Sequence, residues 1–258
     1  MEFGPESFLS PLYLADPRRP TFGFSALETS DSEIMGAGES RYGVRIGQRF
    51  SIARFYTAGD CEGGFQLDGE LGFNGQFDAD NSSDNIGWDG LYGLELSWSR
   101  RKDLTLHLGF FHDSSHLGDE FIEDTGRIRI DYTREEYFAG ASWAFAEGWL
   151  TYGEYGHAFS LSNQELMEPG RLQVGLQHKH APNMWSSRIG WYVATDFSFY
   201  EEDSWSRNLT AQAGLTFGDG LPGSLLRFGL EYYDGRSQIG EFFQSQESHL
   251  ALGFWLDL

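Results

Sequence analysis

The stretch FQLDGELGFNGQF, residues 65–77, alternates between apolar and polar side chains with a period of two. In an extended strand this period sends Phe and Leu to one face and Gln, Asp, Glu and Asn to the other. The same alternation recurs at 189–199, 209–217 and 226–231. A repeated segment of this kind, separated by turns, is typical of β-barrels that cross a membrane.

The charges on the polar faces distinguish a membrane barrel from a soluble one. A soluble barrel has an apolar interior, whereas here both signs of charge are interleaved opposite a face rich in aromatic residues. Such charges can pair inside a lumen while the aromatic face meets lipid. We therefore predict a charged, filled lumen. Its predicted charge network is Arg41, Arg45, Arg49, Asp68, Glu70, Glu95, Arg127, Arg129, Asp131, Arg227 and Glu231.

Roughly twelve such segments follow one another, and an even number suits a single-chain barrel. They lie near 21–29, 42–55, 64–77, 87–99, 103–115, 127–146, 148–160, 170–181, 186–199, 206–217, 225–235 and 245–258. We predict an all-β protein, with one transmembrane antiparallel barrel at 21–258 and an irregular, periplasmic lead-in at 1–20. Long acidic connections alternate with short turns such as APNM, and weak alternation at 133–138 predicts a bulge.

Composition excludes several classes of function. The formal net charge of −21 argues against a nucleic-acid partner. The single cysteine, Cys61, predicts a free thiol and no disulfide framework. Met1 to Ser10 lack the features of a signal peptide, so we expect a mature protein of the Gram-negative outer membrane. The last segment, HLALGFWLDL, resembles the C-terminal strand signal of outer-membrane proteins, which implies the barrel-assembly machinery as a partner.

A polar pair interrupts the apolar face of the strand at 104–115. Leu104 to Phe110 alternate, and the same face then continues with His112 and Ser114 at the predicted outer surface. Polar side chains facing lipid are costly and suggest a function. With a carboxylate, this pair could form a hydrolytic triad. The alternative is a structural clamp at the rim, in which His116, Asp119 and Glu120 hydrogen-bond to neighbouring loops.

Four stretches together resemble the outer-membrane barrels of "domain of unknown function 1207". These are LADPRRP at 14–20, FHDSSHLGDEF at 111–121, EEDSWSRNLTAQAGL at 201–215 and LRFGLEYYDGRSQIGEFF at 226–243. The resemblance implies location and fold, but no activity. Locally, His112-Asp113-Ser114-Ser115 resembles the His-x-Ser-Asn motif of outer-membrane lipid A deacylases, with Ser115 in place of Asn. This local resemblance implies a catalytic His112 and Ser114, with Glu120 as the carboxylate and Asp119, Glu123 and Asp124 as alternatives.

These observations leave three hypotheses about function. The preferred one is a non-catalytic structural or surface-binding barrel with a filled lumen. The alternatives are a surface-leaflet acyl hydrolase of lipid A, using His112 and Ser114, and a small passive pore past Arg41 to Arg49. Outer-membrane lipids and lipopolysaccharide are the expected partners. We expect no cofactor and no metal at His178 and His180, only loosely bound divalent cations at acidic outer loops such as 78–84.

Overall fold

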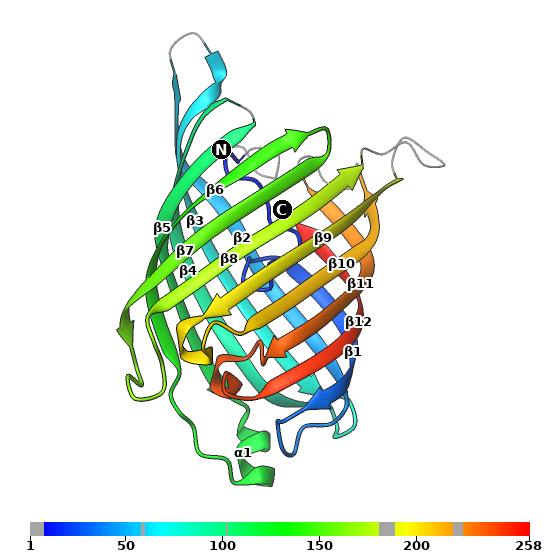
Figure 1. Ribbon diagram of the computed structural model, residues 1–258. Coiled ribbons are helices and arrows are strands. Elements are labelled where there is room, and N and C mark those ends of the chain that lie inside the picture. Colours follow the sequence, from blue (N-terminus) through cyan, green and yellow to red (C-terminus); the bar gives the residue numbers. More distant parts are fainter. Residues whose placement is uncertain (1–7, 58–59, 102, 181–188, 219–223) are drawn as a thin grey trace.

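The computed structural model describes residues 8–57, 60–101, 103–180, 189–218 and 224–258. Its strands form one closed antiparallel barrel in which every strand pairs with its neighbours in sequence (Figure 1). The ring closes where β1 pairs with β12, from Phe22 opposite Leu256 to Ser32 opposite Glu247. The predicted all-β barrel of twelve strands is therefore confirmed.

The strands are β1 (Phe22–Ser32), β2 (Ser40–Thr57), β3 (Asp60–Asp78), β4 (Asp84–Arg101), β5 (Leu104–Leu117), β6 (Thr133–Ala146), β7 (Trp149–Leu161), β8 (Gly170–His180), β9 (Ile189–Tyr200), β10 (Arg207–Phe217), β11 (Leu225–Arg236) and β12 (Gln246–Asp257). One short α-helix, α1 (Asp119–Thr125), and the 3-10 turns η2 (Glu201–Asp203) and η3 (Gly240–Phe242) accompany them in the described ranges. No helix within these ranges is long and apolar enough to cross a membrane.

Alternation along each strand sorts the side chains between the two faces of the barrel wall. In β5, Leu104, Leu106 and Leu108 are exposed on the outside, while Thr105 and His107 are buried on the inside. The other strands follow the same rule, so the large exposed side chains are mostly apolar and the buried ones include many charged groups. This is the reverse of a water-soluble protein and is the arrangement of a membrane barrel.

The two ends of the barrel differ. Six loops lie at the end that carries α1, which we call the loop end: 33–39, 79–83, 118–132, 162–169, 201–206 and 237–245 (Figure 1). The connections at the opposite end, the turn end, are short where the structure describes them, as at 147–148. The APNM turn at 181–184 and the side chain of Cys61 lie outside the described part.

One predicted strand was too long. We expected a segment at 127–146, but β6 begins at Thr133. Gly126 ends α1 in the left-handed conformation (φ 67°), and Asp131 also has a positive φ of 55°, so the backbone between them is not a strand. The sequence RIRID misled us because it alternates like one. The bulge predicted at 133–138 is confirmed, since the pairing of β6 with β7 shifts between Glu135 and Glu136.

Residues 8–20 run inside the ring of strands, where inward-facing side chains hold their backbone (Figure 1). Gln177 of β8 accepts from Leu14 N at 2.9 Å and donates to Leu12 O at 2.9 Å. Arg227 of β11 donates to Leu14 O at 3.0 Å. Tyr13 stacks on Tyr152 of β7, with ring centroids 3.6 Å apart. This segment, which we call the inner segment, therefore bonds to strands on several sides of the barrel.

Two arginines connect the inner segment to carboxylates of the wall. Arg19 lies 3.1 Å from Glu95, 3.3 Å from Glu70 and 3.7 Å from Glu154. Arg18 lies 3.3 Å from Glu136, and its guanidinium is 4.3 Å from the ring centre of Phe111. Because these carboxylates are buried, the arginines supply the charge that compensates them.

The loop between β11 and β12 folds inward across the loop end. Backbone N–H groups of Ile130 and Tyr132 donate to the Glu241 carboxylate at 2.9 and 3.1 Å. Gly240 N donates to Asp89 at 3.1 Å, and Glu241 N donates to Ser115 at 2.9 Å. A small apolar core fixes this arrangement. Its buried members are Ile34, Ile86, Leu117, Phe121, Ile239 and Phe242.

Replacing Arg19 with Gln is expected to lower the free energy of unfolding by about 3–5 kcal/mol, because buried carboxylates lose their compensating charge. Denaturant-induced unfolding of the protein in detergent or lipid measures this loss. Arg207→Gln is the matched control, since Arg207 pairs with Asp234 at an exposed position and its loss should cost about 0–1 kcal/mol. Equal stability of the two variants would contradict the role assigned to Arg19.

Candidate functional site

His112 and Ser114 both face outward at the end of β5 that leads to the loop end. They share a face with Leu106 and Leu108, as the alternation predicted. Asp113, between them, points inward and is buried. The pair therefore lies on the side of the wall where the barrel is otherwise apolar.

Glu135 is the carboxylate that contacts His112. It lies directly opposite His112 across the pairing of β5 with β6, and its Oε1 is 3.2 Å from His112 Nδ1. Both side chains are partly buried, with exposed fractions of 15% for His112 and 30% for Glu135. Our prediction had placed this carboxylate at Glu120, which instead lies on the exposed surface of α1.

The other sequence candidates also lie on the loop that contains α1. Asp119, Glu123 and Asp124 are exposed there or nearly so, and Asp124 accepts a hydrogen bond from Asn81. Glu135 lies farther along the chain than the predicted carboxylates, because the loop at 118–132 separates β5 from β6. Its place could have been found by counting back two residues from the outward-facing Tyr137.

The environment of His112 fixes its ring. Tyr92 of β4 lies opposite it and stacks on it, with centroids 4.3 Å apart and an interplanar angle of 17°. With Nδ1 donating to Glu135, Nε2 is the ring nitrogen left to accept a proton. The Ser114 hydroxyl donates to the carbonyl of Gly90 at 3.4 Å rather than to His112.

On the outer surface, Ser114 has no side chain opposite it on β4. Gly90 faces Ser114, so no side chain projects from β4 at this point. The positions on either side carry stacked pairs, Tyr92 on His112 and Trp88 on His116, each with centroids 4.3 Å apart. We call this feature the Gly90 recess. A Cβ added at Gly90 would meet Ser114 Oγ at 3.4 Å, an ordinary contact distance.

An aromatic surface continues from the recess away from the loop end. Phe110, Tyr137 and Phe159 lie on the outer face of three successive strands, and Tyr137 stacks on Phe159 with centroids 4.5 Å apart. Tyr137 and Phe159 are 61% and 50% exposed. The His112–Ser114 pair thus lies between this apolar surface and the polar loops.

The lumen holds most of the predicted charge network. Arg41 is 2.9 Å from Glu247, and Arg49 is 2.6 Å from Asp68. The other contacts of the predicted residues are Arg45 with Glu231, Arg49 with Glu95, Arg19 with Glu70 and Glu95, and Arg227 with Asp257. Arg127, Arg129 and Asp131 were placed wrongly, because they lie on the loop before β6 and Arg129 and Asp131 are exposed.

The network has a second part that the predicted set of residues does not include. Glu136 of β6 lies 2.8 Å from Arg134 and 2.7 Å from Arg171, and Arg171 also pairs with Glu154. The extra residue of the bulge is Phe159 on β7, so β6 keeps its alternation, with Glu135 outward and Glu136 inward. Arg18 and Arg19 precede the first strand, so no strand pattern could assign them to the lumen.

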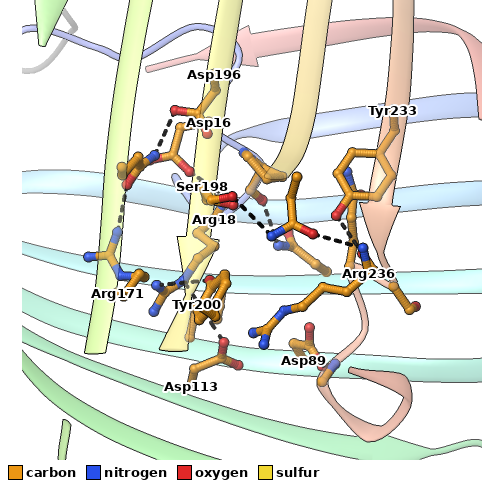
Figure 2. Close-up of a pocket in the computed structure, with 18 of the residues that line it drawn as sticks. Asp16, Arg18, Asp89, Asp113, Arg171, Asp196, Ser198, Tyr200, Tyr233 and Arg236 are labelled. Carbon is orange, nitrogen blue, oxygen red and sulfur yellow. Dashed lines mark hydrogen bonds and ion pairs between the residues drawn. The ribbon is translucent and has the colours of Figure 1, made fainter. Parts of the chain in front are cut away.

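A cavity lies inside the barrel between the inner segment and the β11–β12 loop (Figure 2). Asp16, Arg18, Asp113, Tyr132 and Arg236 are among the residues that line it. Arg18 Nε is 4.0 Å from Asp113, and Arg236 lies against the ring of Tyr200 (Figure 2). Burial, and next the charge of Asp113, raises the pKa of Tyr132, which keeps the phenol neutral.

No group of three or more His, Cys, Asp or Glu suited to a metal ion occurs in the described part of the chain. In the acidic loop at 78–84, Asp78 accepts from the backbone of Gly38 at 2.7 Å and of Asp80 at 2.9 Å. Its carboxylate thus shapes the turn. His178 and His180 contact each other and Trp191 as rings near the turn end.

Comparison with solved structures finds the same fold in outer-membrane barrels. Outer membrane phospholipase A from Escherichia coli matches with a TM-score of 0.63 and 13% identity over 92% of each chain. The calcium-bound phospholipase dimer from Salmonella typhi matches with a TM-score of 0.61 and 13% identity, over 92% of this chain and 90% of that one. The NanC porin matches at 0.51 and 12%, over 92% and 100%. Identities this low show the fold alone.

At the level of sequence, comparison with curated proteins finds no match. One family matches nearly the whole chain, over residues 3–256, and it is described as "Protein of unknown function (DUF1207)". The chain belongs to the DUF1207 family, and its twelve strands form the closed-barrel fold that these outer-membrane proteins share.

Proposed function

We propose that this barrel is an acyl hydrolase of lipids in the outer leaflet of the outer membrane, with the loop end facing the cell exterior. The observation that carries the proposal is the contact of Glu135 with Nδ1 of His112, next to Ser114 on the outward face. Carboxylate, imidazole and hydroxyl are the three parts of a serine-hydrolase triad. A lipid-facing carboxylate is costly, and this chemistry accounts for its position.

In this proposal His112 takes the hydroxyl proton of Ser114 at Nε2 as Ser114 Oγ attacks the carbonyl carbon of a lipid ester. The tetrahedral intermediate collapses, His112 returns the proton to the leaving alcohol, and the acyl group stays on Ser114. Water, deprotonated by His112, then releases the fatty acid. Glu135 orients the ring and stabilises its positive charge.

The approach of Ser114 to His112 needs one change from the geometry described. The hydroxyl donates to Gly90 O, and rotation about χ1 would direct it along the strand face toward the ring. Catalytic hydrogen bonds are often long in free enzymes and shorten when substrate binds. The acyl chains of the substrate would extend over the aromatic surface of Phe110, Tyr137 and Phe159.

The second candidate is a non-catalytic structural or surface-binding barrel, in which His112, Glu135 and Ser114 only stabilise the rim. The hydrogen bond from Ser114 to Gly90 favours it, since the hydroxyl is already satisfied without His112. A passive pore is less well supported. The inner segment bonds to wall residues from β2 to β11, which supports the interpretation that the lumen is closed.

A fluorophosphonate that labels activated serines distinguishes these two candidates without knowledge of the substrate. We expect covalent labelling at Ser114, abolished by Ser114→Ala and slowed about a thousandfold by His112→Ala or Glu135→Gln. Mass spectrometry of outer-membrane lipids should show loss of an acyl chain only with the native protein. Thr151→Ala and His157→Ala are matched controls, because both residues face outward on β7. Absence of labelling on the folded barrel would favour the structural candidate.

Substitution of Gly90 tests the recess. Gly90→Leu should abolish labelling of Ser114 because its side chain would fill the space between the two stacked pairs. Gly90→Ala should retain most of it, since the added Cβ meets its neighbours at 3.4 Å or more. The rate of Ser114 labelling in the three proteins measures the effect. An unchanged rate of Ser114 labelling in the Gly90→Leu variant would show that the probe does not approach Ser114 over Gly90.

Planar-bilayer conductance tests the closed lumen. The native barrel is expected to conduct negligibly, whereas combined Arg18→Gln and Arg19→Gln substitutions should produce openings, because the inner segment loses its ion pairs to Glu70, Glu95 and Glu136. Arg207→Gln again serves as the control. Steady conductance of the native protein would instead support the pore.

A further inference from the structure

The loop between α1 and β6 carries the only lysine or arginine residues of the six loops at the loop end. These are Arg127 and Arg129, in a chain whose formal net charge is −21. Arg127 is engaged in loop packing, since its guanidinium lies 4.5 Å from the ring centre of Phe242 and donates to Glu241 O at 3.5 Å. Arg129 points elsewhere and keeps 42% of its side chain exposed.

Arg129 lies against the outer wall beside the Gly90 recess. Its Nη2 donates to His116 Nδ1 at 3.0 Å and contacts Asp131 at 3.2 Å. Because His116 Nδ1 accepts this hydrogen bond, the neutral ring carries its proton on Nε2, which is a second donor. The guanidinium has further N–H groups beyond the one that contacts His116 and Asp131.

The position of this pair relative to Ser114 follows from strand geometry. His116 and Ser114 are two residues apart on one face of β5, which separates them by about 7 Å. His116 stacks on Trp88, and Trp88 stacks on Phe73 with centroids 5.4 Å apart. Rows of aromatic side chains mark the level of lipid headgroups in membrane barrels. Ile128, 85% exposed between the two arginines, suits the same interface.

We propose that Arg129 and His116 bind the phosphate of the lipid whose ester lies at Ser114, so that the substrates are phosphate-bearing lipids. A guanidinium binds phosphate through paired, charge-assisted hydrogen bonds. Asp131 holds Arg129 only as an exposed partner, 78% exposed, and such pairs are weak enough to exchange for phosphate. The assignment of a substrate rests on the proposed function, but the phosphate contact itself requires no turnover.

The contact is tested in a Ser114→Ala background, where lipids are bound but not cleaved. Native mass spectrometry would compare three probes added to the detergent-solubilised barrel: phosphatidylglycerol, bisphosphorylated lipid A, and diacylglycerol. We expect retention of phosphorylated lipid over diacylglycerol, and Arg129→Gln should reduce that retention about tenfold. Arg207→Gln, which removes an equally exposed arginine at the loop end, should leave it unchanged.

Each outcome has one meaning. Retention of phosphatidylglycerol alone, or of phosphorylated lipid A alone, supports the contact and identifies the source of the phosphate. Equal retention of all three probes, or no effect of Arg129→Gln, overturns it. If the phosphate contact is observed but native Ser114 neither reacts with a fluorophosphonate nor cleaves the retained lipid, the proposed hydrolase fails while the headgroup site stands.

Discussion

Closure of β1 on β12 is the constraint from which the other features follow. A bilayer offers no water to unpaired backbone groups, so a sheet that spans it must end in a closed ring. Once the ring is closed, every strand residue faces either lipid or the lumen. Charged side chains concentrate inside, where Arg49, Asp68 and Glu95 lie within ion-pair distance. Polar groups that remain outside, such as His112 and Glu135, are exceptions to this sorting, and the proposed hydrolase rests on them.

The lumen and the outer wall serve different purposes in this barrel. Inside, opposite charges neutralise one another, and the arginines of the inner segment complete pairs that the wall alone would leave unbalanced. Outside, a single column of β5 presents an imidazole, a hydroxyl and a second imidazole at positions 112, 114 and 116. Gly90 leaves the middle of this column open, and Arg129 lies at its end. In the proposed function, the ester of a phosphorylated lipid would lie at Ser114, and its phosphate would lie farther toward the loop end, at His116 and Arg129.

The sequence predicted the barrel well because a period of two depends only on local geometry. It predicted where His112 and Ser114 face, and it predicted a bulge within 133–138, where the pairing of β6 with β7 shifts. The prediction failed where contacts between residues depend on loops and other segments without a regular alternation. Glu135 lies opposite His112 only because the loop at 118–132 folds back, and RIRID alternates like a strand without forming one. The inner segment has no regular structure at all, so the partners of Arg18 and Arg19 depend on closure of the whole ring.

The inner segment connects the seam of the ring to the ion pairs of the lumen. Only Pro20 and Thr21 separate Arg19 from β1, and Thr21 Oγ1 donates to Asp257 at 2.8 Å, beside the seam. The strand that completes the ring is therefore attached directly to the segment that must lie inside it. The carboxylates around Arg19 come from β3, β4 and β7, so its ion pairs exist only where these three strands surround the segment. The inner segment thus joins the register of the seam to the charge balance of the lumen.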